Sequence, residues 1–272
     1  MIQENFKFYK PCQLLQSYVR YYWVFSSNQM LSTYTFPIGC PQIIFHKRTP
    51  LFVPELGATQ DKLTISGQVN FSSHLQANDD IEMIVVVFYP HTMAMFLHSP
   101  ASLFYNQEIS GYDIEDIGLK ELAEQVFECE DNIVCVNRIE EWLLARLACN
   151  FDHTDYGIKR IRVAIKEICM HTHNTVEELS STCCLSKKQF EREFNTFVGM
   201  NPKEYIRIVR LQKALALLHQ KRNDINHAQI AYASGYADQS HYIREFKRLS
   251  GYTPHSLLKI TEPYSDLFTI PV

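Results

Sequence analysis

The sequence predicts an α+β protein, in which a small β-barrel or sandwich with two helices is followed by an all-α domain. Residues 6–105 are rich in β-branched and aromatic residues and are broken by proline and glycine, as in folds with many short strands. From residue 118 onward, apolar residues recur at helical spacing. The last hundred residues also contain the same kind of short helical unit twice.

In the β-rich part, the strongest predictions are strands at 18–25, 42–46, 62–66 and 82–88. The first of these also fits a strand preceded by a helical turn. The stretch 91–98 follows a proline and predicts a short helix that stops before Pro100.

Residues 118–149 predict two antiparallel helices that are joined near 130–132. In the second helix, an apolar stripe runs over 136–147. This stripe fits either the core of the domain or a helix that forms a dimer.

The polar stretch 150–155 is the predicted domain boundary. We expect an N-terminal domain at 1–152, a helical domain at 153–260 and a tail at 261–272.

The net charge of −4 hides a division along the chain. Residues 1–154 have 9 Lys and Arg against 18 Asp and Glu, whereas residues 155–260 have 17 against 10. An acidic first part and a basic second part fit a regulatory domain joined to one that binds phosphate groups.

The first helical unit begins after a helix predicted at 157–170. Thr175 and Glu178 form a capping box, and Ser186 caps the next helix. In that helix Phe190, Phe194 and Phe197 share one face and predict its core side, and Gly199 ends it. Pro202 then begins a long helix with apolar residues on two faces, which is suited to joining two small bundles.

The second unit repeats this arrangement. Gly235 allows a tight turn, Asp238 caps the following helix, and Tyr242, Phe246 and Leu249 point inward. Gly251 ends the helix, and Thr253-Pro254 begin a last short one. Two consecutive helix-turn-helix units can place two helices in successive major-groove segments of one DNA face.

The stretch 235–254 resembles the signature of the AraC/XylS family of bacterial transcription regulators. Further agreement comes from Leu185-Ser186, from the spacing of Phe194, Gly199, Pro202 and Tyr205, and from the apolar residues of the long helix. The resemblance covers about 157–260. It departs from the family at Ser180, which replaces the usual alanine, and at Cys183-Cys184 in the first turn.

This resemblance implies two recognition helices and double-stranded DNA as the partner. The implied base or phosphate contacts are Lys187, Lys188, Gln189, Glu191 and Arg192 in the first helix, and Gln239, Ser240, His241 and Arg244 in the second. Arginine can bind guanine and glutamine can bind adenine through two hydrogen bonds. Other cations fit phosphate contacts or solvated surface: Lys159, Arg160, Arg207, Arg210, Lys247 and Arg248.

The β-rich part loosely resembles the small sensor domains that precede this DNA-binding unit. The stretches 11–23, 67–69 and 87–90 bear this likeness. A pocket for a small-molecule effector is possible there, and its candidate lining residues are Trp23, Phe36, Phe45 and Phe88. The same aromatic residues also fit an ordinary core, so no ligand-binding residue is assigned.

Catalytic, metal and cofactor sites are not expected. The eight cysteines form no CxxC pair, and no HxH motif with a following glutamate, as a cupin-type metal site uses, occurs among His46, His74, His91 and His98. His171-Thr-His173 fits the end of a helix, where a positive charge is favoured.

Three functions remain open. The first is a sequence-specific transcription regulator, an activator that contacts RNA polymerase and whose first domain senses a small molecule. The second is a constitutive DNA-binding protein whose first domain only forms a homodimer. The third is an enzyme with an appended DNA-binding module, but nucleophile-elbow, P-loop and dinucleotide motifs are absent. A signal peptide and a long apolar run are also absent, which predicts a cytoplasmic protein without membrane contact.

Overall fold

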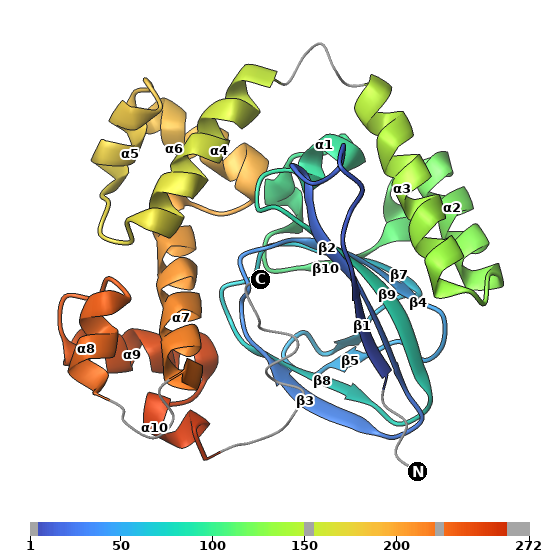
Figure 1. Cartoon of the computed structure of the whole chain (residues 1–272), viewed down its shortest axis with the longest axis horizontal. Coiled ribbons are helices and arrows are strands. Elements are labelled where there is room, and N and C mark those ends of the chain that lie inside the picture. Colours follow the sequence, from blue (N-terminus) through green and yellow to red (C-terminus); the bar gives the residue numbers. More distant parts are fainter. Residues whose placement is uncertain (1–4, 150–154, 221–225, 260–272) are drawn as a thin grey trace.

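The computed structural model describes residues 5–149, 155–220 and 226–259. Residues 5–149 form the β-rich region, and residues 155–259 form the helical region beside it (Figure 1). The α+β prediction is confirmed. Of the predicted boundary at 150–155, residues 150–154 lie outside the described residues, and Asp155 is the first residue of the helix α4. The predicted tail at 261–272 also lies outside the described residues.

The β-rich region contains two antiparallel sheets. The six-stranded sheet has the order β1-β2-β9-β4-β7-β10, and the four-stranded sheet has the order β3-β8-β5-β6. The strands are β1 (Asn5–Tyr9), β2 (Val19–Ser27), β3 (Leu31–Thr35), β4 (Gln42–His46), β5 (Phe52–Val53), β6 (Ala58–Thr59), β7 (Leu63–Ser66), β8 (Ser73–Ala77), β9 (Ile81–Phe88) and β10 (Glu108–Ser110).

All four predicted strands are confirmed as β2, β4, β7 and β9, which are neighbours in the larger sheet. This sheet is covered on both faces, so its strands are almost continuously apolar and easy to find in the sequence. The other strands were not predicted. They are short or alternate with polar residues, as in β3, whose sequence is Leu-Ser-Thr-Tyr-Thr. The predicted helix at 91–98 is shorter, α1 (Met93–Leu97), followed by the 3-10 turn η1 (Ala101–Phe104).

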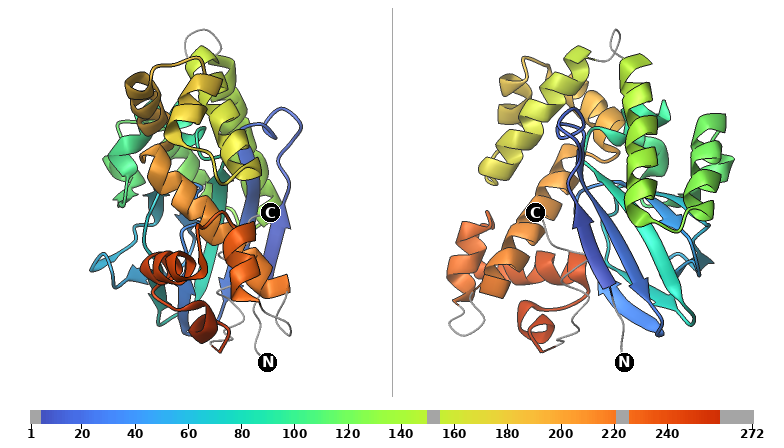
Figure 2. Two further views of the ribbon diagram at one scale, coloured as in Figure 1. Left: turned by 90° about the vertical axis from the view of Figure 1, so that its left-hand side faces the viewer. Right: turned by 45° about the vertical axis from the view of Figure 1, so that its right-hand side comes forward.

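Helices α2 (Ile117–Glu128) and α3 (Asn132–Cys149) form the predicted antiparallel pair. They pack with α1 on one face of the six-stranded sheet, and the four-stranded sheet covers the other face (Figure 2). The apolar stripe of α3 supplies Val136, Ile139 and Leu143 to this core. These three side chains are therefore intradomain core, and not the free face of a dimer helix.

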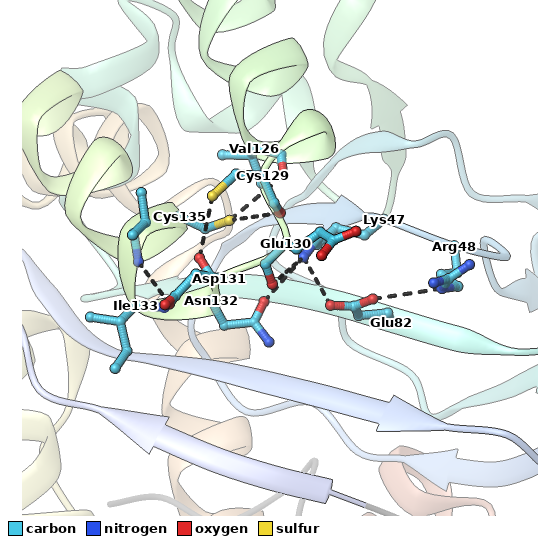
Figure 3. A network of polar contacts seen from close by, with 11 residues as sticks. Lys47, Arg48, Glu82, Val126, Cys129, Glu130, Asp131, Asn132, Ile133 and Cys135 are labelled. Atoms are coloured by element: carbon cyan, nitrogen blue, oxygen red, sulfur yellow. Dashed lines mark hydrogen bonds and ion pairs between the residues drawn. The ribbon is translucent and has the colours of Figure 1, made fainter.

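Lys47 fixes the turn between α2 and α3 to the end of the sheet (Figure 3). Its ammonium nitrogen lies 2.9 Å from Glu82 Oε1 and donates hydrogen bonds to Glu130 O at 3.4 Å and Asn132 Oδ1 at 3.3 Å. The Lys47 side chain is only 6% exposed, so its charge is shielded from water and satisfied by this network. The helix pair is thus attached at its turn as well as along its apolar face.

The helical region has the predicted two units joined by a long helix. Its helices are α4 (Asp155–Met170), α5 (Val176–Thr182), α6 (Lys187–Val198), α7 (Pro202–Gln220), α8 (His227–Ala233), α9 (Gln239–Ser250) and α10 (Pro254–Leu257). The capping box at Thr175, the caps at Ser186 and Asp238, and the glycine ends at 199 and 251 are all confirmed. Phe190 and Phe194 are fully buried, whereas Phe197 is only half-buried.

The two regions contact one another along α7 and at the ends of α6 and α9. Phe36, from the segment between β3 and β4, is buried among α7, α8 and α9. The next residue, Pro37, accepts a hydrogen bond from Gln212 Nε2 of α7 at 2.6 Å. A side chain at Gly199 would stand 2.7 Å from Ala101 O, so α6 ends directly against η1.

Among the helices in the described parts of the chain, none combines the length and hydropathy that a bilayer crossing requires.

Candidate nucleic-acid interface

The two helix-turn-helix units have matching architecture. Helices α5 and α8 have seven residues each, and α6 and α9 have twelve residues each. Each longer helix begins after a side-chain cap and ends at a left-handed glycine. Because of this match, Lys187 corresponds to Gln239, and Arg192 corresponds to Arg244.

The turns of the two units are closed by the same backbone hydrogen bonds. Leu185 N donates to Ser180 O, and Tyr236 N donates to Ala231 O, both at 2.9 Å. Between them, Cys184 and Gly235 occupy equivalent positions with φ of 54° and 91°. Glycine adopts this left-handed conformation freely, but a residue with a Cβ atom is strained in it. Cys184 was predicted to lie in the turn, but its left-handed backbone conformation was not predicted.

We expect Cys184→Gly to stabilise the protein by about 0.5–1 kcal/mol, because relief of the left-handed strain exceeds the added flexibility of the unfolded chain. Thermal unfolding of the full chain would show this as a higher Tm. Cys184→Ala removes the thiol but keeps the Cβ atom, so it serves as the control and should not stabilise. An equal gain in both variants would attribute the effect to the thiol and contradict the backbone explanation.

Apolar contacts set the rotation of both recognition helices. Phe190 and Phe194 of α6 face one core, and Tyr242 and Phe246 of α9 face the other. The opposite faces are therefore turned to solvent. The exposed side chains among the predicted contacts are Lys187, Lys188, Arg192, Gln239, Ser240 and Arg244, and the half-buried ones are Gln189, Glu191 and His241.

Several predicted contact residues have partners within the protein. The Lys187 ammonium contacts the Glu177 carboxylate of α5, which raises the pKa of Lys187. Gln189 Nε2 donates to Glu193 Oε1 at 2.9 Å, and His241 Nδ1 lies 3.4 Å from the donor Ala237 N. These contacts would have to be exchanged or shared on binding DNA. Arg192 and Arg244 are exposed, and no such contact fixes their guanidinium groups in the described structure.

Two of the cations expected to contact phosphate or to be solvated also link elements within the protein. Arg210 Nε and Nη2 donate to Thr172 O at 2.9 and 2.7 Å, which links α7 to the turn after α4. Arg207 Nε lies 2.8 Å from the buried carboxylate of Glu245, which links α7 to α9. The sequence could not separate these arginines from surface cations, since their partners are distant along the chain. Lys159, Arg160, Lys247 and Arg248 remain exposed.

The two units are in direct contact at Thr172 and Gly235. Thr172 follows α4 of the first unit and is 2% exposed. A Cβ atom at Gly235, in the turn of the second unit, would stand 2.3 Å from Thr172 Oγ1. The relative orientation of α6 and α9 is therefore fixed by this contact as well as by α7.

Both recognition helices approach the β-rich region with their C-terminal ends. The end of α6 meets η1, and a Cβ atom at Gly251 of α9 would lie 3.5 Å from Ser72 Oγ. Just beyond, the rings of Tyr252 and Tyr34 pack edge to face at 5.1 Å. The N-terminal halves, which carry the predicted base contacts, are left exposed.

The four candidate pocket aromatics separate into two groups. Trp23 and Phe36 line a cavity between the two sheets. Phe45 and Phe88 point to the other face of the larger sheet and are fully buried beside the helices. Phe45 and Phe88 are thus core residues, because neighbouring strand positions alternate between the faces.

Comparison with known proteins agrees with the geometry of the helical region. A helix-turn-helix domain family matches residues 179–260, and a domain family of unknown function, DUF6597, matches residues 7–110. The HTH-type transcriptional regulator YidL of Escherichia coli (strain K12) is 25% identical over 181 residues, covering 65% of this chain and 59% of YidL. The regulator AlkR of Acinetobacter baylyi is 36% identical over 74 residues, covering 27% of this chain and 24% of AlkR.

The matched segments thus span less than two thirds of the length of these relatives.

Among solved structures, ToxT of Vibrio cholerae is 14% identical with a TM-score of 0.45, covering 98% of this chain and 99% of ToxT. The DNA-binding domain of AdpA, in complex with a target DNA, is 22% identical with a TM-score of 0.34, covering 37% of this chain and 90% of that domain. The family match and the two equivalent helix-turn-helix units show that the helical region is a helix-turn-helix domain of the AraC type, and the curated relatives that share it are transcription regulators.

Proposed function

We propose that the protein is a sequence-specific regulator that binds double-stranded DNA through α6 and α9. The observation that supports this most directly is the equivalence of the two helices, which expose the same face and are held in one fixed relative orientation. Two such helices can read two major-groove segments about one helical turn apart.

The finer parts of the proposal concern the β-rich region. We propose that it senses a small molecule and that the protein acts in the cytoplasm as an activator, through contact with RNA polymerase. The support for sensing is a cavity whose wall also contacts the second helix-turn-helix unit. Homodimer formation remains an additional proposal, and the buried stripe of α3 does not supply its interface.

The second candidate is a constitutive DNA-binding protein in which the β-rich region only dimerises. Exposed Ile133 and Val134 on α3 are compatible with it. A broad panel of metabolites that leaves the Tm unchanged would favour this candidate. For the third candidate, an enzyme, the family of regulators offers no support.

The experiment that tests the proposed function is selection of bound sequences from random duplex DNA, using the full chain at near-physiological salt. Two enriched blocks about one helical turn apart would support the tandem reading. If no sequence is enriched, with or without candidate effectors, the claim of sequence-specific binding is wrong.

We expect DNA binding to weaken steeply as salt rises, because each neutralised phosphate releases counterions. For about six phosphate contacts, the loss between 50 and 200 mM salt is roughly a thousandfold. Fluorescence anisotropy with the selected site, repeated over a salt series, measures the slope. A flat response would contradict a DNA-binding role for the basic region.

A further inference from the structure

The cavity between the two sheets has the features of a binding site. Its volume is about 80 Å³, and its lining combines aromatic and polar side chains. Tyr21, Trp23 and Phe36 supply aromatic surface, while Gln60 and Glu108 supply hydrogen-bonding groups. This mixture is typical of sites for small molecules.

Glu108 is the ionisable carboxyl at the cavity surface, and outside the lining the Arg20 guanidinium donates a hydrogen bond to Cys40 Sγ at 3.1 Å. Among the residues that line it, Glu108 is the only one with an ionisable carboxyl, and none is Lys, Arg or His. Burial raises the pKa of Glu108, although Gln60 Nε2 at 2.8 Å and Ser66 Oγ at 3.4 Å donate hydrogen bonds to it. A carboxylate can accept about four hydrogen bonds, so this one retains unused capacity. Because burial favours the neutral acid, a cationic ligand would stabilise the carboxylate form of Glu108, whereas an anionic ligand would find no Lys, Arg or His among the lining residues.

Buried His46 orients Gln60 toward Glu108 without adding a positive charge. Its Nε2 lies 2.8 Å from Gln60 Oε1, and burial lowers the pKa of His46 to about 4, so the ring is neutral near pH 7. Because Gln60 donates through Nε2 to Glu108, its Oε1 must accept the proton of His46 Nε2. The amide is thereby held with its donors directed at the carboxylate.

A more open hollow outside the cavity has the same charge preference. Its volume is about 440 Å³, and it shares Gln60 and Glu108 with the cavity. Asp61 adds a second carboxylate, and again no Lys, Arg or His is among the lining residues. Cations are therefore attracted to the side of the cavity from which Glu108 is reached.

Another part of the cavity wall is the segment from Phe36 to Cys40, which also contacts the helical region. Phe36 lines the cavity and is part of the core formed by α7, α8 and α9. Pro37 is hydrogen-bonded to Gln212, and a Cβ atom at Gly39 would lie 3.3 Å from both Tyr205 and Ile208 of α7. One face of this segment thus meets the cavity, and the other meets the helix that joins the two units.

We propose that the cavity binds a small organic cation through Glu108 and the surrounding aromatic rings, and that the Phe36–Cys40 segment transmits its presence to α7 and the second helix-turn-helix unit. The inference rests on the proposed function, in which the β-rich region senses a small molecule. The ligand packs against Phe36 and stabilises the wall in its docked position. Its cationic group also gains from the faces of Trp23 and Tyr21.

The first test measures ligand class with the full chain. Methylamine, isobutylamine and benzylamine are compared by calorimetry and thermal shift at pH 7, the latter two against isobutanol and benzyl alcohol. At least one amine should raise the Tm, and isobutylamine or benzylamine, where it binds, should bind at least tenfold more tightly than its matching alcohol. Glu108→Gln should remove this preference, whereas Glu128→Gln, an exposed carboxylate on α2, should preserve it. Absence of amine binding, equal binding of alcohols, or unchanged binding by Glu108→Gln would each overturn the proposal.

The second test measures whether amine binding in the cavity and DNA binding by the helical region affect each other. The binding amine should change affinity for the selected DNA site at least threefold, and DNA should change amine affinity by the same factor. Gln212→Met should bind the amine but show little of this mutual effect, because Gln212 does not line the cavity. Unchanged coupling in this variant would overturn the role of the segment. If the wild type binds DNA selectively but does not bind the amine, the inference about the cavity is wrong and the proposed function still holds. If the wild type does not bind DNA, the proposed function is wrong, and calorimetry still tests amine binding to the cavity.

Discussion

Gly235→Ala should destabilise the protein by roughly 2–5 kcal/mol, because a methyl group there meets both an unfavourable backbone conformation and a neighbouring side chain. The left-handed backbone, with φ of 91°, costs a non-glycine residue about 1–2 kcal/mol. The new Cβ atom would also stand 2.3 Å from Thr172 Oγ1 and 2.7 Å from Thr172 Cβ, and such overpacking typically costs about 1–3 kcal/mol. Urea unfolding of the full chain, followed by circular dichroism, measures the loss.

The matched control is Gly57→Ala. Gly57 has a similar φ of 63°, but a Cβ atom there would meet nothing within 4 Å. This variant should lose only the backbone contribution of about 1–2 kcal/mol. If both variants lose the same stability, the contact with Thr172 is not a source of strain.

Thr172 cannot simply move away, because its carbonyl oxygen accepts two hydrogen bonds from Arg210. Adding Thr172→Ala to Gly235→Ala removes the closest clashing atom, so the double variant should recover part of the loss. This non-additivity is the signature of a direct contact. Since Thr172 and Gly235 belong to different units, Gly235→Ala should also weaken binding to a two-block DNA site more than to a single block.

Local sequence patterns were sufficient for the helical region. The capping box at Thr175, the caps at Ser186 and Asp238, and the glycines that end α6 and α9 depend on residues a few positions apart, so each could be predicted. Short strands such as β5 and β8 could not, because they are defined by partners from distant parts of the chain. Pairing of this kind leaves little trace in a five-residue window.

The candidate sites divide in the same way. The helical spacing of the apolar residues predicted which face of α9 carries Arg244. The same spacing could not show that Arg210 donates hydrogen bonds to the carbonyl oxygen of Thr172. Phe36 was a candidate pocket residue, and its position in the core of the second unit was beyond prediction. Contacts between regions depend on how two separately folded surfaces meet, and no periodicity in either segment encodes that.

Arg192→Ala and Arg244→Ala should each weaken binding to the selected DNA site by on the order of 1–3 kcal/mol, which is roughly 5- to 150-fold. The two arginines occupy equivalent positions in α6 and α9, on exposed faces opposite the buried aromatic residues. A guanidinium group can donate two parallel hydrogen bonds to guanine, and alanine loses both.

The position of each loss within the DNA site distinguishes base recognition from phosphate binding. When the sequence selection is repeated with each variant, Arg192→Ala should relax the base preference in one block of the DNA site, and Arg244→Ala should relax it in the other block. The reason is that each helix contacts its own segment of the major groove. Arg48→Ala makes the same change of charge in the β-rich region, where the side chain is 63% exposed, and should alter affinity less than twofold. If either arginine variant weakens binding equally on all sequences, that arginine contacts phosphate, and base recognition must come from its neighbours on the same helix face.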